Sequence, residues 1–255
     1  MPAEFTCEEI LEICEGRLSV GMMPDEAGEI CADTRKLSEG QWFLALPGEK
    51  FDGHDFLGDA FAAGALGAIV AERSHYPISN PNFPLLAVGD PLVAYLALAR
   101  NWRKRIAPKV VAITGSSAQG STGQLCAAVF GQARRCHYAP NRMDDQRGVA
   151  CTLLGMADDT QIAIVEMMTA GFKQIDSLAR CVLPEIGIIS GIEEAQLKRF
   201  ASVEKIAEAH CELFENLKPS RGVAIIGSAN ETLVCRARQV FSGKLLVFED
   251  DSVQV

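Results

Sequence analysis

The sequence predicts an α/β protein of two consecutive domains. Two observations lead to this prediction: the chain has 255 residues, and from Lys109 onward continuous apolar strands alternate regularly with helices. A chain of this length exceeds the roughly 100–200 residues of an average domain. Apolar strands separated by helices are typical of a parallel sheet that is covered on both faces. We therefore predict a small α/β domain over 1–106 and a parallel-sheet domain over 107–255.

The first domain is predicted to be framed by two helices. Helical spacing of apolar residues indicates one over 7–15, and a second over 91–105 ends before Pro108. The stretch from Pro77 to Pro84 is rich in proline and asparagine, which predicts an exposed loop. The remaining predicted elements are strands near 28–32, 42–46, 67–71 and 85–88 and a helix at 55–64.

The second domain is predicted to repeat the order of strand and helix. The segments that show this order are 110–114, 121–133, 135–138, 148–156, 161–166, 173–181, 186–190, 203–217, 222–226, 231–240 and 244–248. No internal repeat interrupts them. The pattern therefore favours one sheet built from successive crossover units.

Composition excludes several classes of function. The net charge of −9 argues against nucleic acid or an anionic membrane as the main partner. No run approaches the roughly 18 apolar residues of a membrane span, and the N-terminus lacks a signal-like basic region and apolar core. We therefore expect a cytoplasmic protein without membrane insertion. The nine cysteines contain no CxxC pair, which favours buried, reduced thiols over a metal or disulfide framework.

The strand at 110–114 runs into a loop and a helix. The loop reads Gly115, Ser116, Ser117, Ala118, Gln119, Gly120, Ser121 and Thr122. A phosphate-binding loop wraps backbone N–H groups around phosphate oxygens, and its lysine holds the β and γ phosphates. Gln119 carries no charge, and neither possible register of the motif restores a cation. The loop alone is a weak signal, because plain strand-to-helix connections also need tight backbone geometry.

Several other motifs resemble the Mur ligase family. In the first domain they are Asp33 to Lys36, Gly40 to Glu49, Phe51 to Phe56 and Ala60 to Ala65. In the second they are Gly148 to Leu154, Ile164 to Glu166, Pro184 to Ile189 and Val203 to Ala209, in the family's order. The resemblance covers nearly the whole chain. It implies a Mur-ligase-type N-terminal domain that binds a UDP-linked cell-wall precursor, followed by a P-loop-like ATPase domain that is truncated at Val255.

The resemblance also implies substrate-binding residues in the first domain. They are Asp33, Thr34 and Arg35, with Asp52, Gly53 and His54 as a second group. Each group has a structural alternative. The first reads equally as a turn with an arginine salt bridge. The second is interpreted as a turn and helix cap in preference to a catalytic histidine.

The family's nucleotide chemistry is altered at the matching positions. In these ligases a loop lysine holds ATP, a glutamate and a histidine bind magnesium, and a carbamylated lysine supports a second magnesium. Glutamine is a poor ligand for a hard cation in comparison with a carboxylate or an imidazole, and histidine cannot form a carbamate. Without its partners the retained glutamate is interpreted as a hydrogen-bonded remnant. This chain has Gln119, Glu166, Gln196 and His210 at these positions.

Additional acidic residues are predicted near the loop. The segment before Gly148 contains Asp144 and Asp145, and the strand at 186–190 is followed by Glu193 and Glu194. Carboxylates there would repel a nucleotide's phosphates unless a metal intervened. A metal site at His210, Cys211 and Glu212 is disfavoured, because adjacent residues of a helix face different directions.

Three functional hypotheses follow. The favoured one is a catalytically inactive pseudoenzyme without cofactors, acting as a scaffold for a protein partner or a homo-oligomer through apolar surface at the truncated edge. The second is a sensor or regulator that binds a UDP-N-acetylmuramoyl-peptide through the first domain. The third is an active ATP-dependent peptidoglycan-precursor ligase with unusual residues.

Overall fold

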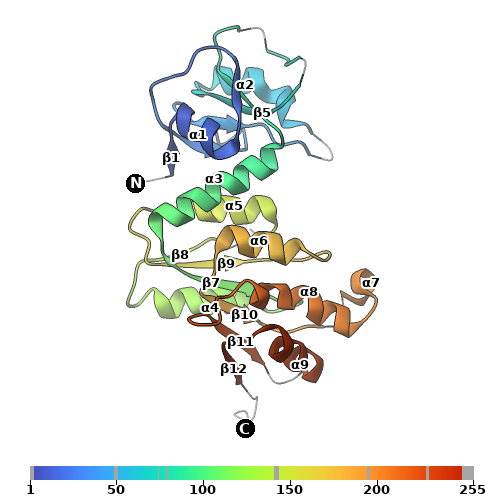
Figure 1. The fold of residues 1–255 in the computed structure, drawn as a ribbon. Helices are drawn as coiled ribbons and strands as arrows, with labels where there is room; N and C mark the ends of the chain where they lie inside the picture. The colour runs from blue at the N-terminus through green and yellow to red at the C-terminus, as the bar shows by residue number, and fades with distance from the viewer. Residues whose placement is uncertain are drawn as a thin grey trace. The chain divides into compact units, whose positions relative to one another are not determined.

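The protein folds into two α/β units. The computed structural model describes residues 3–48, 51–73, 75–78, 80–140, 144–193, 196–227 and 230–248. Contacts within the chain define the units Met1–Arg105 and Ile106–Val255 (Figure 1). Each unit is built around one six-stranded sheet. The predicted α/β class is confirmed.

The sheet of the first unit is mixed. Its strand order is β1-β3-β4-β5-β6-β2, with parallel pairing from β3 to β6 and antiparallel pairing of β1 and β2 at the two edges. The sequence prediction missed both edge strands. β1 is too short to show a period, and β2, which reads Arg-Leu-Ser-Val, has only two apolar residues to indicate a strand. The strands are β1 Glu4–Phe5, β2 Arg17–Val20, β3 Gly28–Cys31, β4 Trp42–Leu44, β5 Gly67–Ala71 and β6 Leu85–Val88.

The first helix of this unit begins at a well-defined cap. At the start of α1, the Thr6 side chain accepts from the Glu9 backbone N–H and the Glu9 carboxylate accepts from the Thr6 N–H, which forms a capping box. The helix predicted at 55–64 is a 3₁₀ turn followed by a short α-helix. The helices are α1 Cys7–Cys14, η1 Gly53–Phe56, α2 Leu57–Ala62 and α3 Pro91–Ile106.

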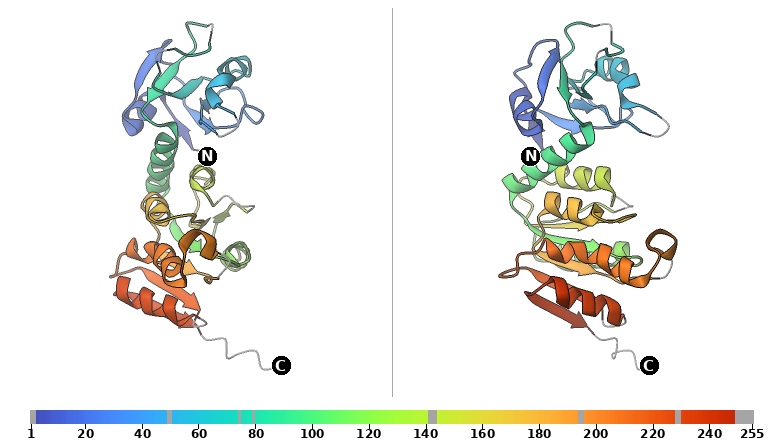
Figure 2. Two further views of the ribbon diagram at one scale, coloured as in Figure 1. Left: turned by 90° about the vertical axis from the view of Figure 1, so that its right-hand side faces the viewer. Right: turned by 45° about the vertical axis from the view of Figure 1, so that its right-hand side comes forward.

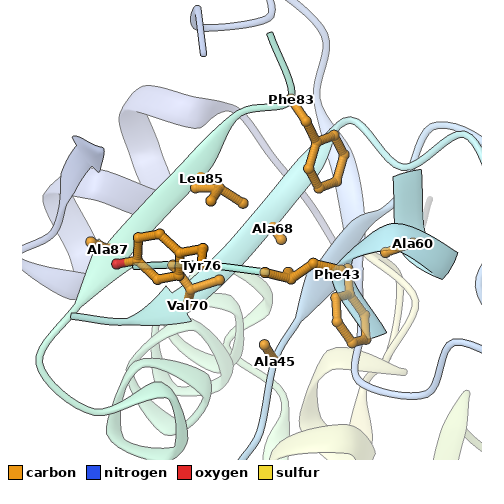
Figure 3. Close-up of a cluster of buried hydrophobic side chains, with 10 residues drawn as sticks. Phe43, Ala45, Ala60, Ala68, Val70, Tyr76, Phe83, Leu85 and Ala87 are labelled. Atoms are coloured by element: carbon orange, nitrogen blue, oxygen red, sulfur yellow. The ribbon is translucent and has the colours of Figure 1, made fainter. Parts of the chain in front are cut away.

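The stretch predicted as an exposed loop contributes to the core of the first unit. Phe83 is buried and packs edge to face on Phe61, with ring centroids 5.5 Å apart. Tyr76, just before the stretch, is also buried and donates its hydroxyl to the Ala71 carbonyl at 3.1 Å. Both rings belong to the cluster in Figure 3, which lies over β4, β5 and β6. Proline and asparagine therefore indicated the turns correctly but not the burial between them.

The sheet of the second unit is entirely parallel, as predicted. Its order is β12-β11-β10-β7-β9-β8. The strands are β7 Lys109–Thr114, β8 Cys136–Tyr138, β9 Ile162–Glu166, β10 Ile186–Ile189, β11 Val223–Gly227 and β12 Lys244–Phe248. The helices are α4 Gln119–Phe130, α5 Gln146–Leu154, α6 Gln174–Val182, α7 Leu197–Phe200, α8 Val203–Glu215 and α9 Glu231–Val240.

Helices cover the two faces of this sheet unequally. The crossover through α4 runs in the opposite direction along the strand order from the crossovers through α5, α6, α8 and α9. Because such crossovers are right-handed, α4 is on the face opposite the other described helices of this unit (Figure 2). Ile225 and Leu246 are neighbours in register on one face, where Leu246 and Phe248 are 43% and 56% exposed. Among the residues that the structure describes, the predicted cover on both faces is therefore incomplete at β12.

Cysteines are less buried than the sequence predicted. All nine are free thiols, but only Cys7, Cys181 and Cys211 are buried, while Cys151 and Cys235 are exposed. The last two lie on the solvent-facing sides of α5 and α9, which short apolar runs next to these cysteines did not reveal. Among the described helices none is both long and apolar enough to cross a membrane.

Candidate functional site

The loop after β7 lies at the carboxyl edge of the second sheet. A Cβ atom on Gly115 would lie 2.2 Å from the Ser190 hydroxyl, so only glycine allows this approach. Ser190 donates its hydroxyl to the Ser117 carbonyl at 2.6 Å, and the Ser116 N–H donates to the Gly191 carbonyl at 2.9 Å. The loop is thus held against the segment that follows β10.

The loop turns into α4 through a left-handed residue. Ala118 has φ 58°, a conformation that costs a non-glycine residue about 1–2 kcal/mol. Its carbonyl accepts from the Thr122 N–H at 2.9 Å. Gln119, Gly120, Ser121 and Thr122 therefore form the first turn of α4, with their backbone N–H groups at a helix N-terminus.

Acidic side chains contact the loop from two directions. The Ser117 hydroxyl donates to the Glu193 carboxylate. The Gln119 amide donates from Nε2 to Asp144 Oδ2 at 2.7 Å, and Asp144 is only 6% exposed. Asp144 is held in place through its carbonyl, which accepts from the Met168 N–H at 2.8 Å. The predicted acidic neighbours Asp144 and Glu193 are therefore present, whereas Glu194 and residues 142–143 lie outside the described residues.

Glu166, at the end of β9, is buried and hydrogen-bonded. Tyr138 of β8 donates its hydroxyl to Glu166 Oε1, and burial together with this carboxylate raises the pKa of Tyr138. A Cβ atom on Gly123 would lie 2.8 Å from Glu166 Oε1 and 2.9 Å from the Tyr138 ring. Glycine in α4 thus leaves the space in which the tyrosine and the carboxylate meet.

Gln196 and His210 form a neutral hydrogen-bonded relay. Gln196 Oε1 accepts from the Ser116 hydroxyl at 2.8 Å and lies 3.0 Å from His210 Nε2. Since that oxygen only accepts, Nε2 carries the proton and Nδ1 accepts from the Thr114 hydroxyl at 2.9 Å. Burial lowers the pKa of His210 to about 4. The relay links the loop to α8 without a charge.

His210 and Glu212 of α8 face different partners, as helix geometry predicts. Glu212 is buried and accepts from the Lys173 N–H at 2.6 Å and from the Asp176 N–H at 3.0 Å. These donors lie at the N-terminus of α6, so the carboxylate caps that helix. In the described part of the chain, no group of three His, Cys, Asp or Glu side chains could hold a metal ion.

The loop's residues do not fit a nucleotide triphosphate in the manner of a phosphate loop. The glycine turn and the helix N-terminus are suitable for an anion. However, Gln119 supplies no charge, and the nearby side chains Asp144 and Glu193 are carboxylates. Gln196 Oε1 is already engaged by two donors, which leaves Glu166 as the retained member of the family's magnesium set.

In the first unit, Asp33, Thr34 and Arg35 form a turn after β3, in which Asp33 and Thr34 are half-buried and Arg35 is exposed. The Asp33 carboxylate accepts from Arg35 Nε at 2.9 Å and from the other guanidinium nitrogen at 2.8 Å. These bonds lower the pKa of Asp33 to about 2. The Arg35 side chain is nevertheless 87% exposed. The structure therefore contains the predicted salt bridge and also leaves the guanidinium open to a ligand.

Asp52, Gly53 and His54 form the predicted turn and cap. Asp52 accepts from the His54 N–H at 3.1 Å and from Arg73 at 2.6 Å. His54 is fully buried; its Nε2 accepts from the Ala71 N–H at 2.8 Å, so its Nδ1 donates to Asp52 at 2.6 Å. Both ring nitrogens are thus used within the fold. A Cβ atom on Gly53 would lie 2.7 Å from the Leu46 nitrogen.

The fold and the loop define an α/β protein of two units, in which a glycine-containing loop leads into a helix at the carboxyl edge of a parallel sheet. Comparison with known proteins identifies the family. The family model described as "Mur ligase family, catalytic domain" matches residues 27–102, and the family model described as "Mur ligase middle domain" matches residues 113–250. The chain belongs to the Mur ligase family.

Individual relatives agree with this assignment. The chain is 37% identical to the UDP-N-acetylmuramoyl-tripeptide–D-alanyl-D-alanine ligase of Synechocystis sp. over 96% of this chain and 53% of the relative. It is 34% identical to the ligase of the same name from Bacillus subtilis over 78% of this chain and 43% of the relative. A crystal structure of MurF from Acinetobacter baumannii has a TM-score of 0.88 at 26% identity, covering 97% of this chain and 53% of that one. The chain spans about half the length of these proteins.

The interpretation of the chain as a catalytically inactive pseudoenzyme and scaffold is wrong. It rested on the substitutions at Gln119, Gln196 and His210. The relatives that match across both units are ligases by name. Single substitutions change how a site works, but they do not by themselves establish that it has lost its activity.

Sequence reasoning missed two residues that shape the site. Tyr138 reaches Glu166, and Ser190 holds the loop. Both lie at or just after the carboxyl ends of predicted strands of one parallel sheet, and such ends meet at one edge. That rule was the signal that could have identified them.

Proposed function

We propose that this chain takes part in ligating D-alanyl-D-alanine to a UDP-N-acetylmuramoyl-tripeptide, as the precursor-binding and nucleotide-type domains of an ATP-dependent peptidoglycan-precursor ligase. The observation that carries the proposal is the match at 37% identity to a ligase of that name, which covers 96% of this chain and so spans both units. Because the chain covers 53% of that relative, the activity of the whole protein is part of the proposal.

The exposed Arg35 supports the precursor-binding part. Asp33 orients its guanidinium through two hydrogen bonds, while most of the side chain faces solvent. A planar guanidinium held in this way suits the diphosphate of a UDP-linked ligand. We assign Arg35 to that contact, with Asp33 and Thr34 shaping the turn.

Binding of the precursor can be measured by calorimetric titration with UDP-N-acetylmuramoyl-tripeptide. We expect Arg35→Gln to weaken binding about tenfold, because a hydrogen bond to a charged group contributes about 1.5 kcal/mol or more. Arg17→Gln is the matched control, since Arg17 is also exposed and pairs with Glu72. Equal affinity of the Arg35 variant and the wild type would contradict the assignment.

Ligation is tested in the same preparation by adding D-alanyl-D-alanine and Mg-ATP and detecting the product by mass spectrometry. Formation of the ligated product supports the whole proposal. Precursor binding without product limits the function of these 255 residues to holding the precursor, as in a sensor. A protein that binds no precursor refutes the proposal.

We also propose that the protein self-associates through the open face of β11 and β12. Ile225, Leu246 and Phe248 lie there, and the last two are largely exposed. Burying such side chains against a second copy is favourable. A monodisperse monomer at micromolar concentration in light scattering would rule this out.

A further inference from the structure

Gln119 has an unusual environment for a residue at the start of a helix. Its Nε2 donates to Asp144 Oδ2 at 2.7 Å, whereas its Oε1 is buried and has no hydrogen-bond partner among the described residues. Leaving a buried acceptor without a donor or cation is unfavourable. The two atoms belong to one planar amide, so this acceptor lies next to the nitrogen that contacts Asp144.

The net charge of Gln119 and Asp144 differs by two from the net charge of a phosphate-loop lysine and a neutral neighbour. A lysine beside a neutral residue would present a charge of +1 to a phosphate, whereas Gln119 beside Asp144 presents −1. A divalent cation bound next to this pair restores +1. The arithmetic therefore favours a divalent over a monovalent cation as the substitute for the ammonium group.

We propose that a divalent cation binds beside Gln119 Oε1 and Asp144 and supplies the charge of the missing loop lysine. This inference rests on the proposed function, because it explains how the loop would accept a nucleoside polyphosphate. Mg²⁺ is commonly bound by one or two carboxylates together with substrate phosphates. A complete cage of protein ligands is therefore not required.

The cation is distinct from one held by Glu166. The Glu166 carboxylate has contacts of its own: its atoms are 3.9 Å from a Cβ built on Gly120, and Tyr138 donates to it. Gln119 faces Asp144 instead. The proposed site thus adds one cation to any that Glu166 binds.

The test counts cations in the nucleotide complex. Mn²⁺ is titrated into the chain with ATP and followed by electron paramagnetic resonance, while calorimetry gives the ATP affinity at each Mn²⁺ concentration. Gln119→Lys supplies the ammonium directly, and Asp144→Asn removes the carboxylate but keeps an acceptor for Gln119. Gln132→Lys makes the same change at an exposed position of this unit and serves as the control.

We expect the wild type and Gln132→Lys to bind one more Mn²⁺ per complex than Gln119→Lys or Asp144→Asn. At low Mn²⁺, Gln119→Lys should bind ATP about tenfold or more tightly than the wild type, because it gains charged hydrogen bonds. Equal Mn²⁺ counts in all four proteins would overturn the inference, as would a wild type that binds no ATP at any Mn²⁺ concentration. Titration with the UDP precursor shows separately whether the proposed function has failed.

Discussion

Acidification should destabilise the protein through His210. The side chain is fully buried, and both ring nitrogens have neutral partners, Thr114 and Gln196. Protonation would leave a buried cation. The pKa of His210 is lowered by burial from 6.5 to about 4. The native state therefore resists a proton that the unfolded chain accepts.

The sign and size of the effect follow from this difference in pKa. The contribution of His210 to stability is fully present above pH 6.5 and is lost as the pH falls toward 4, because only the unfolded state binds the proton in that window. One pH unit corresponds to about 1.4 kcal/mol per proton. The fall from 6.5 to about 4 therefore amounts to about 3 kcal/mol.

Urea unfolding between pH 8 and 4.5, with a reductant present, measures this loss. Carboxylates with lowered pKa values, such as Asp33 and Asp176, also destabilise the protein in acid, but they are common to the wild type and His210→Gln. The difference between the two proteins isolates His210. It should change by more than 1 kcal/mol per pH unit near pH 5. A difference that is constant with pH would refute the reasoning.

Two further predictions concern stability at neutral pH, both measured by urea unfolding. Glu212→Ala should cost about 2 kcal/mol, because the α6 N-terminus loses a buried, charged acceptor of two N–H groups, and Glu212→Gln should cost less; equal costs would show that charge is unimportant there. Gly28→Ala should cost about 2 kcal/mol, because its Cβ would lie 2.3 Å from the Gly40 carbonyl oxygen. Gly58→Ala in α2 meets no atom within 4 Å and should stabilise by about 0.5 kcal/mol, so a loss there would contradict the explanation.

Much of the fold could be predicted because strands and helices reflect local patterns. The parallel order of the second unit followed from apolar runs such as Val110 to Ile113, which need helices on their faces. Edge strands were missed because β1 has two residues and therefore no measurable period. Phe83 was assigned to an exposed loop because its burial depends on Phe61 and on β5 and β6, which are distant in sequence.

The candidate site was predicted in part. The positions of Gln119, Glu166 and His210 along the chain followed from the family resemblance, and their chemistry followed from residue type. Their partners could not be predicted. Gln119 meets Asp144 across 25 residues, and His210 meets Thr114 across 96. The pseudoenzyme interpretation was wrong because it considered only the substituted positions. It did not take into account that the relatives matching both units are ligases by name.

The order of residues alone was enough to establish the α/β class, the family and the absence of a loop lysine, because periodicity, turn chemistry and motifs belong to contiguous segments. Only the folded chain shows which side chains contact Gln119, the residue at the position of that lysine. Parallel crossovers bring the ends of β7, β8, β9 and β10 to one edge of the sheet. Pairings such as Tyr138 with Glu166 form there, because proximity at that edge is set by strand order and not by separation along the sequence.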